Sequence, residues 1–223
     1  MSGIAIIGLA LRFPGASTAR QFWQNLCGKV ESIQCFPDDE LVAAGVPRET
    51  LSDRTYVKAA PTLADIDRFD ASFFGYTPKE AALMDPQNRL FLEICAAAFD
   101  DAGYAPARLG DHRVGVFAGG GGALTSYLLA YAQHPALRGQ TAGLEHIAND
   151  RDFLATRVSF KLNLTGPSLT VQTACSTSLV AVHLAVQSLL HGECEMALAG
   201  ASVVRIPHAV GYFAERGSVH SAD

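Results

Sequence analysis

Positive charge is in short supply in this sequence of 223 residues. It holds 17 lysines and arginines against 22 aspartates and glutamates, which gives a formal net charge of -5 at pH 7. Proteins that bind nucleic acids or strongly anionic membrane surfaces usually carry a basic face that neutralises phosphate groups. We therefore expect neither nucleic acid nor a membrane among the partners of this chain.

The cysteines lack the spacing of a disulfide framework or of a metal site. There are five of them, an odd number, and no two form a Cys-x-x-Cys pair. They are Cys27, Cys35, Cys95, Cys175 and Cys194. Unpaired thiols without metal-ligand spacing fit a reducing compartment, so we expect a cytoplasmic protein with no bound metal.

Long hydrophobic runs are also missing. The apolar stretch from Gly3 to Leu11 has no basic region before it and is interrupted by Arg12 and Pro14, which argues against a signal peptide. No other run approaches the length needed to cross a membrane. Apolar residues nevertheless make up 49% of the chain, enough for a substantial core.

The most informative stretch has a strand, helix, strand pattern. Leu169 to Thr173 alternates apolar and polar residues and is rich in β-branched types, as a strand is. The following residues to Leu190 are apolar in most helical directions. Gly192 is placed to end this helix, and Met196 to Ser202 forms a second strand-like run. We therefore expect a buried helix that joins two parallel strands.

Cys175 falls at the junction between the first strand and this helix, within the sequence Thr-Ala-Cys-Ser-Thr-Ser-Leu. Unpaired N–H groups and the helix dipole at such a position favour the thiolate, so we expect the pKa of the Cys175 thiol to be lowered. A thiolate there is a candidate nucleophile, and nearby backbone N–H groups, that of Cys175 included, could hold the oxyanion of an attacked acyl carbonyl. The alternative is a small buried residue in a tight turn.

Other segments complete an α/β pattern with helices on both faces of the sheet. Ile4 to Leu11 reads as a central strand buried on both faces, and Ser17 or Thr18 can cap a helix through Leu26. The hydrophobic pattern from Val30 to about Ala64 is irregular, which predicts a long segment that runs over the surface.

Further signals follow in the second hundred residues. Asp85-Pro86 marks a helix start, and Gly103 marks its end. Arg113 to Gly119 predicts a strand, and Gly119 to Gly122 predicts a flexible turn, since no Gly-Lys-Ser/Thr ending of a phosphate loop follows. Asn149 or Asp150 can cap a helix from Arg151 to Leu162.

None of the seven histidines is an obvious base for Cys175. His183 is eight residues further along the same predicted helix, about 12 Å up its axis, and His191 is farther. The remaining five lie in predicted loops or in the tail: His112, His134, His146, His208 and His220. The sequence thus offers a nucleophile without an assignable base.

Many segments together resemble the N-terminal half of a β-ketoacyl synthase of the modular polyketide synthase type. They are Ile4 to Ala16, Phe22 to Leu26, Phe69 to Gly75, Asp85 to Leu90, Asn149 to Leu164, Gly166 to Ser168, Thr173 to Leu179 and Ala197 to Gly200. Ala96 and Ala97 stand where that family usually has Trp-Glu, and Ala222 where it usually has proline.

The resemblance implies a thiolase-like fold, in which two similar α/β halves stack into an αβαβα arrangement and pair as a homodimer. Cys175 matches the cysteine that takes an acyl chain from the phosphopantetheine thiol of an acyl carrier protein. A malonyl-type extender then loses carbon dioxide and attacks the acyl-enzyme, in polyketide or related fatty acid biosynthesis. The partners implied are the carrier protein and neighbouring domains of a megasynthase. No cofactor is bound directly.

The resemblance also implies that residues 1–223 are only the N-terminal part of such a domain. The family's two catalytic histidines and its lysine belong to the second half, and Gly217 to Asp223 reads as the opening of an unfinished turn and strand. We therefore expect these residues alone to be inactive in condensation, and to be poorly soluble or molten. Two alternatives remain open: a cysteine acyl-thioester hydrolase or another thiolase-fold enzyme, and a non-catalytic half-domain that serves as an interaction module.

Overall fold

The structure is a computed structural model, and it describes residues 3–120, 127, 144–217 and 219–222. The chain divides into two compact units. The first consists of Met1–Ala10 and Asp65–Ile206, and the second of Leu11–Ala64 and Pro207–Asp223. Cys175 belongs to the first unit, which carries the sheet expected from the sequence.

A three-stranded parallel sheet forms the centre of the first unit. Its strands are β4 (Val114–Gly120), β5 (Ser168–Thr170) and β6 (Met196–Ser202), in the order β5-β4-β6. Val116 of β4 stands opposite Ser168 on one side and Leu198 on the other. The two strands that flank Cys175 in sequence are therefore parallel, as predicted, and β4 lies between them.

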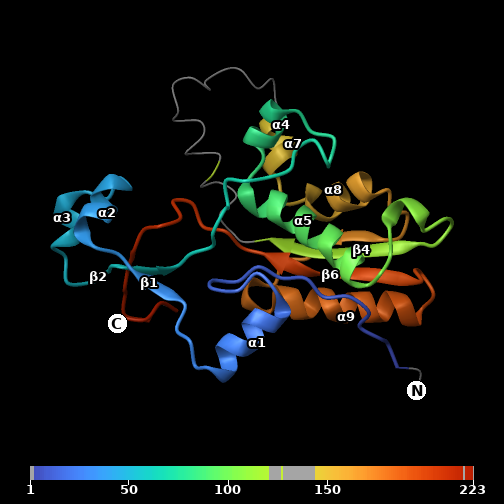
Figure 1. The fold of residues 1–223 in the computed structure, drawn as a ribbon, viewed down its shortest axis with the longest axis horizontal. Helices are drawn as coiled ribbons and strands as arrows, with labels where there is room; N and C mark the ends of the chain where they lie inside the picture. Colours follow the sequence, from blue (N-terminus) through green and yellow to red (C-terminus); the bar gives the residue numbers. More distant parts are fainter. Residues whose placement is uncertain (1–2, 121–126, 128–143, 218, 223) are drawn as a thin grey trace. The chain divides into compact units, whose positions relative to one another are not determined.

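Helices cover both faces of this sheet, which confirms the predicted α/β class (Figure 1). Helices α5 (Pro86–Asp101) and α8 (Phe153–Leu162) lie on one face, and α9 (Thr177–Leu190) lies on the other. The unit also contains α4 (Pro78–Leu83), η1 (Pro106–Arg108), α7 (Leu144–Asn149) and η2 (Ala174–Ser176).

Alternation along β4 builds a core on each side of the sheet. Val114, Val116 and Ala118 are buried in one cluster with the apolar residues of α5 and α8. Phe117 points the other way and packs with Ala181 and Ala185 of α9. Because successive strand residues face opposite sides, a strand covered on both faces must be apolar throughout.

The start of α5 follows its sequence signal closely. Asp85 is the N-cap, its side chain accepts a hydrogen bond from the backbone N–H of Gln87, and Pro86 occupies the first turn. The predicted stop at Gly103 also holds, since this glycine adopts a φ of 74° after the helix ends. Local capping chemistry alone was enough to place this helix.

The predicted cap of α8 was wrong. The helix begins at Phe153, and its N-cap is Asp152, which makes no side-chain cap hydrogen bond. The Asn149 side chain instead accepts from the Asp85 N–H at 2.8 Å and donates to the Leu83 carbonyl at 2.9 Å. The Asn149 side chain, which the sequence predicted as a helix cap, is therefore used for tertiary hydrogen bonds instead.

The prediction of a central strand at Ile4 to Leu11 was also wrong. No strand is present there, and Ile6 is 87% exposed. The run lies against the end of α5: the Leu9 N–H donates to Asp101 Oδ2 at 2.8 Å, and a Cβ on Gly8 would lie 2.4 Å from the Ala98 carbonyl oxygen. Since no strand in the described part of the chain pairs with it, only some of its apolar surface is buried.

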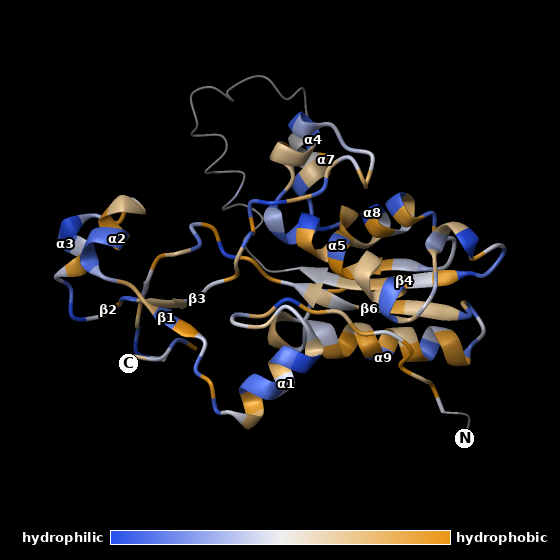
Figure 2. Ribbon diagram, viewed as in Figure 1, coloured by the Kyte–Doolittle hydropathy of each residue, from blue (hydrophilic) through white to orange (hydrophobic). Residues whose placement is uncertain are grey.

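Helix α9 departs from its prediction in a different way, because it is buried on one side only. Its buried residues are Thr177, Ala181, Ala185 and Ser188. Leu179, Val182 and Leu190 are 74%, 45% and 51% exposed, although α9 is strongly hydrophobic in composition (Figure 2). The sheet contacts a stripe of small residues, and nothing in the described part of the chain covers the larger ones.

The second unit is more regular than its sequence suggested. It contains α1 (Ala19–Cys27), α2 (Asp38–Ala43) and α3 (Arg48–Leu51), and Thr18 caps α1 as predicted. Strand β1 (Ile33–Cys35) pairs with β3 (Ala59–Pro61), and β2 (Tyr56–Val57) pairs with β7 (Tyr212–Phe213). Both pairs are antiparallel, so the region predicted to be irregular has short elements of its own.

One prediction cannot be compared with the structure in full. Gly119 and Gly120 are the last residues of β4 and not part of a turn. Gly121 and Gly122, which complete the predicted flexible turn, lie outside the described residues.

Candidate active site

The turn that carries Cys175 lies at the carboxyl end of the parallel sheet. After β5 ends at Thr170, the Val171 N–H still donates to the Ala118 carbonyl at 2.7 Å, which carries the pairing with β4 one step further. The chain then turns through Thr173 to Ser176 and enters α9. Ligands of open α/β sheets commonly bind beyond the carboxyl ends of the strands, which makes this edge the natural place for chemistry.

Cys175 itself is an exposed residue in the middle of the short helix η2. It comes two residues before α9 begins at Thr177, so the predicted position at the junction of strand and helix is confirmed. Its exposure argues against the alternative of a buried packing residue. No described residue forms a hydrogen bond or an ion pair with its thiol, and its role as nucleophile stays a prediction.

The residue before the cysteine has an unusual backbone conformation. Ala174 has a φ of 53°, in the left-handed region that side chains other than glycine rarely adopt. Thr173, before it, has a φ of -135° and a ψ of 36°, outside both the helical and the extended regions. The sharp change between these two residues reverses the chain and leaves the next residue, Cys175, on the outside of the turn.

Side-chain hydroxyls hold this turn together. Thr177 Oγ1 accepts from the Thr173 N–H at 3.0 Å and donates to the Ala174 carbonyl at 2.8 Å. Ser176 Oγ lies 2.8 Å from the Thr173 carbonyl and 3.0 Å from Thr173 Oγ1. The hydroxyl residues around Cys175 thus satisfy backbone groups that a sharp turn leaves without a helical or sheet partner.

A glycine of the neighbouring strand allows α9 to start this close to the sheet. A Cβ on Gly119 would lie 1.9 Å from Thr177 Cγ2 and 2.7 Å from the Val171 carbonyl oxygen. Any side chain at position 119 would therefore displace the first turn of α9 or the strand end. The absence of a side chain at position 119 of β4 therefore helps to determine the position of Cys175.

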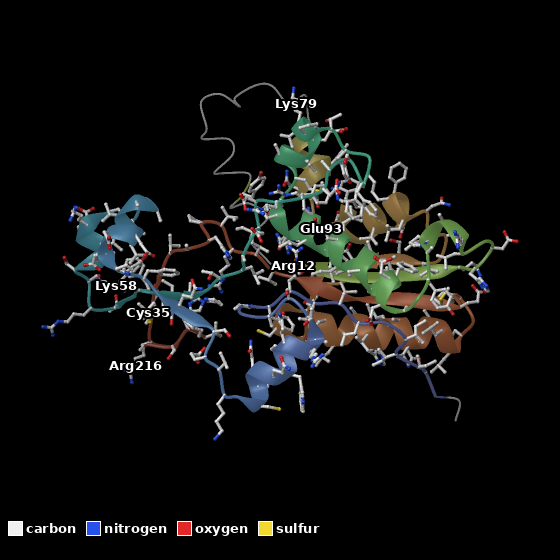
Figure 3. All side chains as sticks on the ribbon, viewed as in Figure 1. Arg12, Cys35, Lys58, Lys79, Glu93 and Arg216 are labelled. Atoms are coloured by element: carbon white, nitrogen blue, oxygen red, sulfur yellow. The ribbon has the colours of Figure 1, made fainter. Side chains whose placement is uncertain are left out.

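The other four cysteines are less suitable as nucleophiles. Cys95 and Cys194 are buried, and burial raises the pKa of the Cys95 thiol. Cys27 ends α1 and Cys35 ends β1 (Figure 3), and both are exposed in the second unit. Cys27 is the last residue of α1, and Cys35 is separated from α2 by Phe36 and Pro37. Neither lies in a helical turn that leads directly into a long helix, as Cys175 does, so they serve as internal comparisons for its reactivity.

The described histidines provide no base for the thiol. His183 lies on α9 and is exposed, and His191 follows the end of that helix. His208 Nε2 accepts from the Leu63 N–H at 2.8 Å, and the ring of His220 lies at a tilt beside that of Tyr212, with 4.9 Å between the ring centroids. His112 is an exposed loop residue. His134 and the side chain of His146 lie outside the described part of the chain.

A buried polar cluster at the start of α5 was not anticipated from the sequence. Asp85, Gln87, Asn88 and Asn149 are each at most 2% exposed. Burial raises the pKa of Asp85 to about 6, although hydrogen bonds from Gln87 and the nearby charge of Arg89 favour its ionised form. Gln87 Oε1 lies 4.0 Å from the Cβ position of Gly120, so this cluster reaches the same edge of the sheet. Only the polar run that follows Asp85-Pro86 hinted at it.

Neither a metal site nor a membrane span is present in the described ranges. No group of three or more histidine, cysteine, aspartate or glutamate residues is arranged to hold a metal ion there. No helix there is long and apolar enough to cross a bilayer.

Comparison with known proteins assigns a family to this arrangement. The family profile described as the N-terminal domain of β-ketoacyl synthase matches residues 1–223. A component of the phenolphthiocerol/phthiocerol polyketide synthase of Mycobacterium tuberculosis is 49% identical over 227 residues, which cover 99% of this chain and 15% of that protein. The pikromycin polyketide synthase component PikAIII of Streptomyces venezuelae is 41% identical, over 90% of this chain and 13% of its own length.

Solved structures agree with these sequence matches. Ketosynthase twelve of the bacillaene polyketide synthase of Bacillus amyloliquefaciens superposes with a TM-score of 0.85 at 33% identity, over 98% of this chain and 38% of that one. The chain therefore spans well under half of the solved ketosynthase and about a seventh of the mycobacterial protein. It has the fold of the N-terminal part of a thiolase-like ketosynthase, and it belongs to the β-ketoacyl synthase family.

Proposed function

We propose that these residues form the cysteine-bearing part of a polyketide ketosynthase, and that Cys175 accepts the growing acyl chain. One observation carries the proposal: in a chain that matches the family profile throughout, Cys175 is exposed in a tight turn at the carboxyl edge of the parallel sheet. The acyl donor is a thioester on the phosphopantetheine of an acyl carrier protein.

The first step is a transfer between two thiols. The Cys175 thiolate attacks the carbonyl carbon of the acyl thioester, forming a new C–S bond and a tetrahedral oxyanion. The oxyanion collapses, the bond to the phosphopantetheine sulfur breaks, and that sulfur leaves as a thiolate that takes up a proton. The proposal assigns the backbone N–H of Cys175, within η2, to the stabilisation of this oxyanion.

The second step joins two carbon units. A malonyl-type extender on a carrier protein loses carbon dioxide, and the resulting enolate attacks the Cys175 thioester to give a β-ketoacyl product and the free thiol. Decarboxylation needs hydrogen-bond donors for the developing enolate oxygen. No described histidine contacts Cys175, so the proposal assigns these donors, two histidines and a lysine, to the second half of the ketosynthase fold.

The exposed face of α9 fits the same assignment. Leu179, Val182 and Leu190 are apolar and uncovered, as expected of a layer that a second α/β half would pack against. Pairing into a homodimer, docking of an acyl carrier protein, neighbouring megasynthase domains and a cytoplasmic location belong to this proposal too. They rest on the polyketide synthase relatives.

Acylation can be tested on the chain without the condensation step. The chain is incubated with an acyl thioester of phosphopantetheine, its intact mass is measured, and the modified residue is located by peptide mapping. We expect one acyl adduct on Cys175 and none on the Cys175→Ala variant, with exposed Cys27 and Cys35 as internal comparisons. An adduct on Cys27 and Cys35 but not on Cys175 would contradict the proposal. Steady release of free acid would favour a thioester hydrolase, and no adduct on any cysteine would favour a non-catalytic half-domain.

A further inference from the structure

The hydroxyl of Thr177 bridges the two peptide groups that enclose the conformational reversal before Cys175. It accepts from the Thr173 N–H at 3.0 Å and donates to the Ala174 carbonyl at 2.8 Å. One side chain therefore fixes both the entry to the turn and its exit. Because a hydroxyl has one proton to donate and lone pairs to accept, both hydrogen bonds can form together.

These two hydrogen bonds act on a backbone conformation that is unfavourable by itself. Ala174 has a φ of 53°, and a residue with a Cβ stays in this left-handed region only when its surroundings hold it there. If Ala174 relaxed to the right-handed or extended region, the direction of the chain at Cys175 would change with it. The orientation of the thiol thus depends on groups that keep Ala174 in place.

Packing leaves the Thr177 side chain little freedom to do anything else. The residue is 6% exposed, and its Cγ2 lies 1.9 Å from the position that a Cβ of Gly119 would occupy. The methyl group is seated over the glycine of β4, which directs the hydroxyl toward the turn. A change of rotamer would bring a different group over Gly119 and would break both hydrogen bonds.

We propose that Thr177 is a positioning residue for Cys175, which holds the thiol in the orientation needed to attack an acyl carbonyl. This inference rests on the proposed function, since it concerns the same acyl transfer. Attack requires a defined approach to the carbonyl carbon, so a misdirected thiol reacts slowly even when it is fully accessible. Thr177 then controls the rate of acyl transfer at Cys175 and not the affinity for the acyl donor.

Two pairs of variants isolate the hydroxyl from the rest of the side chain. Thr177→Val keeps the branched shape and removes the oxygen, and it is compared with the parent. Thr177→Ser and Thr177→Ala both lack Cγ2 and differ from each other only in the oxygen. Thr170→Val is the matched control, because Thr170 Oγ1 also lies near two backbone groups, 3.1 Å from the Arg151 carbonyl and 3.5 Å from the Ala155 N–H, away from the turn.

The readout is the acylation of Cys175 by an acyl phosphopantetheine thioester at increasing concentration. We expect Thr177→Val and Thr177→Ala to lower the saturating rate constant about tenfold, which is within the range expected for two lost net hydrogen bonds. The half-saturating concentration should stay the same. Thr177→Ser and Thr170→Val should remain within about threefold of the parent. Alkylation of Cys175 by iodoacetamide should change little in any variant, because it needs only an accessible thiol.

The outcomes separate this inference from the function on which it rests. A parent chain whose Cys175 is not acylated overturns the proposed function and this inference with it. A parent that is acylated, with Thr177→Val as fast as the parent, overturns the positioning role alone. If Thr177→Val does not fold, as judged by circular dichroism, the serine and alanine variants decide, and equal rates for those two overturn the inference. Rescue by serine but not by alanine supports it.

Discussion

Replacing Gly119 with alanine puts a methyl group where β4 and the first turn of α9 meet. The new Cβ would lie 1.9 Å from Thr177 Cγ2 and 2.7 Å from the Val171 carbonyl oxygen, whereas nonbonded carbon atoms prefer about 3.5 to 4.0 Å. One neighbour is backbone and cannot move away alone. The other is fixed by its hydrogen bonds to the turn. The start of α9 must therefore shift.

The size of the effect follows from these two clashes. Overpacking a well-filled site costs about 1 to 3 kcal/mol, and the loss of a Thr177 hydrogen bond would add about 1 kcal/mol. We expect Gly119→Ala to lower the free energy of unfolding by about 3 kcal/mol, measured by urea denaturation with circular dichroism. Adding Thr177→Ser removes Cγ2 and should recover about 1 kcal/mol, since residues in direct contact have coupled effects.

Gly200 provides the matched control on the neighbouring strand. It lies on β6 opposite Ala118, and a Cβ there would meet only Phe91 Cε2, at the ordinary distance of 3.6 Å. Gly200→Ala should change the free energy of unfolding by no more than about 1 kcal/mol. If Gly119→Ala lowers the free energy of unfolding as little as Gly200→Ala does, β4 and α9 do not approach each other this closely. Gly119 would then not determine the position of Cys175.

Two further predictions concern Asp85 and α9. Burial raises the pKa of Asp85 from 3.8 to about 6, so the folded chain keeps a proton that the unfolded chain loses between about pH 4 and pH 6. The free energy of unfolding, measured by urea denaturation at a series of pH values, should therefore fall by up to about 3 kcal/mol as the pH rises through this window. Asp85→Asn cannot titrate but keeps an oxygen that can cap the helix, so its free energy of unfolding should change little over the same window. On α9, Leu179→Gln should change the free energy of unfolding by less than about 0.5 kcal/mol, because Leu179 is 74% exposed. Ala185→Leu should lower it by about 1 to 3 kcal/mol, because Ala185 is packed against the sheet. Equal costs for these two variants would show that the assignment of the two faces of α9 is wrong.

Short-range chemistry is what the sequence predicted well. Asp85 and Pro86 marked the start of α5 because capping involves only neighbouring residues. The position of Cys175 between strand and helix followed in the same way, from a change of hydrophobic period at one point in the chain. The family resemblance rested on motifs of a few residues, and the comparisons confirmed it.

Features that depend on distant partners were not predictable. The run from Ile4 to Leu11 is apolar enough for a central strand, but composition does not reveal which strand, if any, lies beside it. The Thr177 contact depends on Gly119, which is far away in sequence and was interpreted only as the point where a predicted strand runs into a turn. The burial of Asp85 likewise depends on Asn149, which had been expected to cap another helix.

The two faces of α9 differ in the size of their side chains, and this difference affects how rigidly the Cys175 thiol is held. The side chains that this helix buries against the sheet are short and contribute little transfer free energy, while covering Leu179, which is 74% exposed, could add roughly 1 to 2 kcal/mol. Part of the free energy available to hold α9 in place therefore depends on what covers its outer face. A domain or protein that packs on the exposed face of α9 would reduce the mobility of this helix, and also that of the turn before it, which carries Cys175.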